Sequence, residues 1–68
     1  MHTREEVYQM LNAAIQTQQG WRGAYDVAKA SKERADAISA ARNYKALEGV
    51  IKTLRWVLEY PGIGSPLQ

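Results

Sequence analysis

The stretch ALEGVIKTLRWVL, residues 46–58, decides the predicted fold. Its apolar side chains recur at alternating steps of three and four residues, the repeat of a helix that buries one face. This series, with one tyrosine before it, is called the leucine seam and consists of Tyr44, Leu47, Ile51, Leu54 and Leu58. No proline lies between Trp21 and Tyr60, and alanine, the best helix former, is frequent there. The sequence therefore predicts a long second helix over about residues 21–60.

A shorter first helix is expected over about residues 4–19. Thr3 and Glu6 have the spacing of a capping box, in which each side chain bonds the other residue's backbone N–H. The apolar stripe that follows is Val7, Met10, Leu11, Ala14 and Ile15. Gly20 is the expected end of this helix, and Pro61 ends the second one. Residues 1–60 are thus predicted to form a single helical domain, with residues 61–68 as an extended C-terminal tail.

The continuity of the second helix is open, because its apolar positions follow two registers. One register ends at Ile38 and the other begins at Ala40. The offset fits either a continuous helix with a stutter or a break near Ser31 or Asn43. The absence of glycine and proline between Gly23 and Gly49 favours the continuous helix.

The predicted lengths bear on assembly. A first helix that ends at residue 19 is too short to cover the leucine seam. Burying one Leu or Ile side chain is worth about 1.5–3 kcal/mol, so an uncovered seam would cost much of a small domain's stability. We therefore expect an all-α helical hairpin that assembles into a helical-bundle homo-oligomer, with the leucine seam at the interface. The alternative is a three-helix monomer, in which a break near Asn43 folds the seam inward.

The composition argues against an enzyme or a metal centre. The chain has no cysteine, and its single histidine, His2, lies at the start. Most of its carboxylates have a basic residue four positions away, which is typical of a solvated helix surface. We therefore expect no catalytic residue, metal or cofactor. No apolar run approaches the roughly 20 residues of a membrane span, and the N-terminus does not resemble a signal peptide, so a cytoplasmic protein is expected.

Aromatic and basic residues lie together on the side of the second helix opposite the seam. Flat aromatic rings beside cations suit a nucleobase with its phosphate, through stacking and charge. The candidate ligand-binding residues are Arg42, Lys45, Lys52, Trp56 and Tyr60, with Trp21 and Tyr25 as a second cluster. The alternative interpretation is structural: Trp56 packs on a neighbouring helix, and Trp21 closes the hairpin. A formal net charge of +2 is low for a protein that binds nucleic acid through its phosphates.

The stretch 46–58, ending a short cysteine-free chain of two helices, resembles the small helical proteins encoded by phages and prophages. In size and helix layout the chain is similar to anti-defence sponges, which are oligomers that bind nucleotide immune signals. The resemblance implies a non-enzymatic protein in the host cell cytoplasm that sequesters a cyclic oligonucleotide or ADP-ribose type signal at subunit interfaces. Direct inhibition of a host protein is the alternative, and a nucleic-acid accessory role is the third. No ligand residue is carried over from these proteins.

Overall fold

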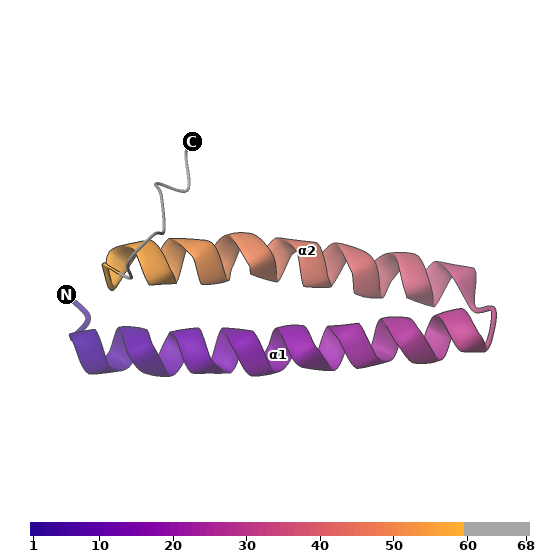
Figure 1. The fold of residues 1–68 in the computed structure, drawn as a ribbon, viewed down its shortest axis with the longest axis horizontal. Helices are drawn as coiled ribbons and strands as arrows, with labels where there is room; N and C mark the ends of the chain where they lie inside the picture. The colour runs from indigo at the N-terminus through magenta and orange to yellow at the C-terminus, as the bar shows by residue number, and fades with distance from the viewer. Residues whose placement is uncertain (60–68) are drawn as a thin grey trace.

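The chain folds into two antiparallel helices that lie side by side along their whole length, as Figure 1 shows. The computed structural model describes residues 1–59. Helix α1 spans Arg4–Ala30 and helix α2 spans Arg34–Val57. The described residues form no strand, so the predicted all-α hairpin is confirmed. Tyr60 and the expected tail at residues 61–68 lie outside the described residues.

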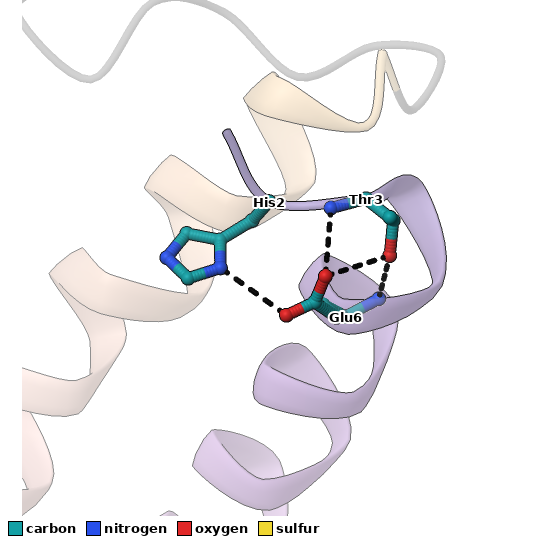
Figure 2. A network of polar contacts seen from close by, with 3 residues as sticks. All are labelled: His2, Thr3 and Glu6. Atoms are coloured by element: carbon teal, nitrogen blue, oxygen red, sulfur yellow. Dashed lines mark hydrogen bonds and ion pairs between the residues drawn. The ribbon is translucent and has the colours of Figure 1, made fainter.

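Helix α1 begins at the predicted capping box (Figure 2). The Glu6 backbone N–H donates to the Thr3 hydroxyl at 3.1 Å, and the Thr3 N–H donates to the Glu6 carboxylate at 3.1 Å. His2 lies 3.3 Å from the same carboxylate through its Nδ1. Two backbone N–H groups that the first helical turn leaves without partners are satisfied in this way.

The expected end of the first helix at Gly20 is wrong. Helix α1 continues through Gly20 and Gly23 to Ala30, and so the expected helix over 21–60 is wrong as well. A glycine inside a helix costs only about 1 kcal/mol relative to alanine, which packing farther along the helix offsets. Ala28, buried at 4% exposure, belongs to that later packing.

The break between the helices falls at Ser31–Glu33, which was one of the alternatives for the second helix. The Glu33 N–H donates to the Ala28 carbonyl at 2.8 Å, and the Lys32 N–H donates to the Lys29 carbonyl at 3.2 Å. These two bonds form a Schellman motif, in which the residue after the C-cap adopts a left-handed conformation. Lys32 has φ 59° and fills this position, usually taken by glycine. Asn43, the other candidate break, lies inside α2.

The two helices are nearly equal in length, so α1 covers the leucine seam. The buried core is formed by Leu11, Ala14, Ile51 and Leu58, and the side chains packed around it are Val7, Tyr8, Ile15, Leu47 and Leu54. Tyr44 is half-buried, and its backbone carbonyl accepts a hydrogen bond from Gln18 Nε2 at 3.5 Å. The premise that the seam has no partner within the chain is therefore wrong. A homo-oligomer would have to form through another surface.

Candidate functional site

A shallow hollow opens between α1 and α2 in the turn-proximal half of the hairpin. Its volume is about 220 Å³, and its lining residues are Arg22 and Tyr25 from α1 with Ala41, Tyr44 and Lys45 from α2. We call it the tyrosine hollow. Each helix contributes one tyrosine and one cation, so the site exists only because the chain folds back at Ser31–Glu33.

The tyrosine hollow has an aromatic lining. Tyr25 and Tyr44 are both half-buried, so their rings are held by the hairpin and still reach solvent. The Lys29 ammonium lies 5.8 Å from the centroid of the Tyr25 ring, within the range of a cation–π contact. Tyrosine combines an apolar ring with a hydroxyl, which suits the boundary between a packed core and water.

Within residues 1–59, the two cations of the hollow are engaged only in surface ion pairs. Arg22 Nε lies 3.7 Å from Asp26 Oδ1, and Lys45 Nζ lies 3.4 Å from Glu48 Oε2. Exposed pairs of this kind contribute about 0–1 kcal/mol, because water screens them. Arg22 and Lys45 can therefore turn toward an anion at little cost.

The other predicted ligand residues of α2 lie apart from this hollow. The helical repeat places Arg42, Lys52 and Trp56 on the side of α2 that faces away from α1, a surface called the outer stripe. All three are exposed, and the exposed fraction of Trp56 is 48%. Gly49, between them, has open space at its Cβ position. Trp56 thus does not pack into the core of its own hairpin.

The structure separates the second predicted cluster. Tyr25 lines the tyrosine hollow, whereas Trp21 lines a different hollow of about 440 Å³ together with Ala24, Val27 and Ala40. In a single chain, Trp21 and Tyr25 therefore line different hollows. The sequence predicted Tyr44 at a subunit interface and did not indicate that it lines a hollow with Tyr25. The available signal was the possible break near Ser31, because folding there brings residues near 25 against α2.

A pair of carboxylates stands at the turn. Glu33 and Asp36 share a hydrogen bond and repel each other, and both effects raise the pKa of Glu33 above its ordinary value of 4.5. At the other end, hydrogen bonds from the Thr3 backbone, from His2 and from the Thr3 hydroxyl lower the pKa of Glu6. Within residues 1–59, no three His, Cys, Asp or Glu side chains gather closely enough to hold a metal ion.

Two more observations bear on the function. Neither α1 nor α2 has a segment long and apolar enough to cross a membrane. No protein-family model, curated protein or solved structure gives a significant match to this chain. Proposals about its function therefore rest on the geometry of its own residues.

Proposed function

We propose that this chain is a non-enzymatic binding protein that captures a phosphorylated nucleotide-type ligand in the tyrosine hollow. The observation that carries the proposal is the convergence of Tyr25 and Tyr44, one from each helix, with a cation from each helix beside them. A nucleobase stacks on the tyrosine rings, and Arg22 and Lys45 bind its phosphate.

The chemistry of these residues suits such a ligand. Stacking of a base on an aromatic side chain contributes about 1–3 kcal/mol in single-stranded nucleic acid complexes. An arginine binds phosphate through two parallel N–H donors, and a lysine supplies a second positive charge. The hollow of about 220 Å³ is open to solvent and is large enough to hold part of such a ligand.

The ligand class that we propose is a cyclic oligonucleotide or an ADP-ribose derivative. Both carry a flat base and negatively charged phosphates, which the aromatic lining and the cations of the hollow match. In a phage-encoded sponge, such binding would withhold an immune signal from a host effector without chemical change.

The test is calorimetric titration of the full chain with cyclic dinucleotides, cyclic trinucleotides and ADP-ribose. Removal of both hollow cations, Arg22→Ala with Lys45→Ala, should weaken binding at least about tenfold. The matched control removes two cations outside the hollow, Arg42→Ala with Lys52→Ala, and should bind as the wild type does. No binding of any of these ligands, or loss of binding only in the control, would overturn the proposal.

A second candidate function is direct binding of a protein partner through the outer stripe. The observation that favours it is Trp56, a large aromatic side chain left 48% exposed on a helix beside basic residues. Tryptophan and arginine dominate the energetics of many protein interfaces. If the partner is a host protein that this chain inhibits, Trp56→Ala should abolish the inhibition. Arg22→Ala with Lys45→Ala should leave the inhibition unchanged. The opposite pattern would favour the tyrosine hollow.

A further inference from the structure

One face of the hairpin carries charge only at its two ends, among the residues that the structure describes. Two hollows lie along it: one of about 550 Å³ near Val7, Met10 and Leu54, and the one of about 440 Å³ near Trp21 and Val27. The helical repeat places the following side chains on this uncharged face: Met10, Ala13, Thr17, Gly20, Trp21, Ala24 and Val27 from α1, and Ser39, Asn43, Ala46, Val50, Thr53 and Val57 from α2. The tyrosine hollow lies on the opposite side of the groove between the helices.

Much of the apolar surface of this face remains in water. Met10 is 58% exposed, Val27 67%, Val50 43% and Val57 49%. The hydrophobic side chains that the hairpin does bury are few, and Ala14, Ala28 and Ala40 are among them. Two helices that leave this much apolar surface exposed have the incomplete core of half a bundle.

The size of the face matches a stable dimer interface. Helix α1 has 27 residues, and at about 1.5 Å per residue it is about 40 Å long. Two helices packed about 10 Å apart present a face about 20 Å wide. Their product is about 800 Å², the area that each partner contributes to a standard protein–protein interface.

We propose that a second copy of this chain docks on the uncharged face, with α1 lying antiparallel to α1 of the partner, and closes a four-helix bundle. The interface is isologous, so a contact of one residue with a second is repeated, with the two copies exchanged, on the other side of a two-fold axis. The axis passes near Thr17, the midpoint of α1.

The positions of large and small side chains fit this arrangement. Met10 and Ala24 lie seven residues on either side of Thr17, so Met10 of each copy lies level with Ala24 of the other. Trp21 and Ala13 lie four residues on either side, and they pair in the same way. Met10 and Trp21 of each copy thus meet an alanine of the other copy, which is how facing layers interdigitate.

Charge favours the antiparallel arrangement over the parallel one. Glu33 and Asp36 stand at the turn and already repel each other within one chain. A parallel dimer would bring the carboxylates of both copies to the same end. The antiparallel dimer separates the two turns and brings each turn toward His2 and the N-terminal amine of the other copy.

The first test is the mass in solution of two variants that place the same charge on opposite sides of α2. Val50 is 43% exposed on the uncharged face, and Ile38 is 44% exposed on the side away from α1. Wild type and Ile38→Asp should sediment at twice the mass of one chain, and Val50→Asp should sediment as a monomer. A monomeric wild type, or a dimer that Val50→Asp leaves intact, would overturn the proposal.

The second test is disulfide cross-linking, which does not depend on whether Val50→Asp folds. The natural chain has no cysteine, so a single introduced thiol has no competitor. Thr17→Cys should form a covalent dimer rapidly under mild oxidation, because the two-fold axis brings the two copies of residue 17 together. Gln19→Cys lies on the other flank of α1 and should cross-link slowly; equal rates would overturn the antiparallel arrangement.

The dimer does not rest on the proposed nucleotide binding, because the tyrosine hollow faces the other way. Val50→Asp should therefore become monomeric and still bind the nucleotide. A wild-type chain that is monomeric and still binds the nucleotide would overturn the dimer alone, and a wild-type dimer that binds no nucleotide would overturn the nucleotide proposal alone.

Discussion

Arg4 and Leu58 are 54 residues apart, and the Arg4 guanidinium donates a hydrogen bond from Nη2 to the Leu58 backbone carbonyl at 3.1 Å. This contact ties the first turn of α1 to the residue that caps α2. The central carbon of the same guanidinium group, Cζ, lies 5.5 Å from the centroid of the Tyr8 ring. The Arg4 side chain thus links the two helices at the open end of the hairpin, where no loop joins them.

We expect Arg4→Ala to lower the free energy of unfolding by about 1–2 kcal/mol, because it removes a charged hydrogen bond to a part-buried carbonyl. Urea unfolding followed by circular dichroism, at one fixed protein concentration, measures the change. Arg34→Ala removes the same charge at the other end of the molecule and serves as the control. Equal losses in the two variants would contradict a specific role for the Arg4–Leu58 bond.

The capping box of α1 predicts a dependence on pH. The pKa of Glu6 is lowered in the folded chain. The ionised Glu6 carboxylate therefore stabilises the fold fully when the pH is above 4.5, the ordinary pKa of the group, and this stabilisation is lost as the pH falls through the lowered pKa. Glu6→Gln should therefore unfold at a lower temperature than the wild type at pH 7, with the difference shrinking in acid. Glu5→Gln, in the same turn and outside the capping box, is the control and should lower the unfolding temperature at pH 7 by less.

The carboxylates at the turn predict the opposite dependence. A raised pKa means that Glu33 favours the folded state when it is protonated, and that this effect is lost as the pH rises through the raised pKa. Glu33→Gln removes the repulsion from Asp36 and should raise the melting temperature at pH 7. The gain in melting temperature should disappear below pH 4.5, where Glu33 of the wild type is protonated and as uncharged as the glutamine. A gain that is constant across this range would mean that repulsion is not its cause.

Lys32 holds a left-handed conformation that costs a non-glycine residue about 1 kcal/mol. Lys32→Gly should therefore raise the free energy of unfolding by about 1 kcal/mol. Part of this gain is offset because glycine increases the conformational entropy of the unfolded chain and so stabilises that state. Lys32→Ala has the Cβ atom without the charge, and so it separates the conformational effect from the electrostatic one. The alanine variant should unfold as the wild type does.

Gly49 lies within α2 with open space at its Cβ position. Gly49→Ala should stabilise the protein by about 0.5–1 kcal/mol, because alanine favours the helix and meets no neighbour. Denaturant unfolding of the two proteins gives the difference. A loss of stability would show that another molecule approaches the backbone closely at this point of the outer stripe.

Local signals in the sequence predicted local structure well. The capping box at Thr3 and Glu6 depends on residues three apart, and it forms as the spacing indicates. The helical state of both segments follows from their periodicity. The end of α1 was missed because Lys32 takes a conformation that the sequence signals only when glycine is present. Gly20, which carries the usual stop signal, stays helical because α1 packs along α2 beyond it.

The candidate site depended on that one turn. With the turn at Gly20, the leucine seam had no partner and Tyr44 belonged to a subunit interface. With the turn at Ser31–Glu33, the same seam faces α1, and Tyr44 lines the tyrosine hollow with Tyr25. The periodicity of α2 specifies which of its sides is buried, and only the position of the turn specifies what buries it. That position depends on packing between residues far apart in sequence.

The short connection at Ser31–Glu33 also governs how the hairpin responds to mechanical load. The two helices are antiparallel, and the connection joins them at one end only. A force that pulls residues 1 and 59 apart therefore acts on one layer of packed side chains at a time. The Arg4–Leu58 bond bears that force first, and the layers nearest the Schellman motif bear it last. The molecule should unzip progressively at low force instead of resisting as a sheared unit.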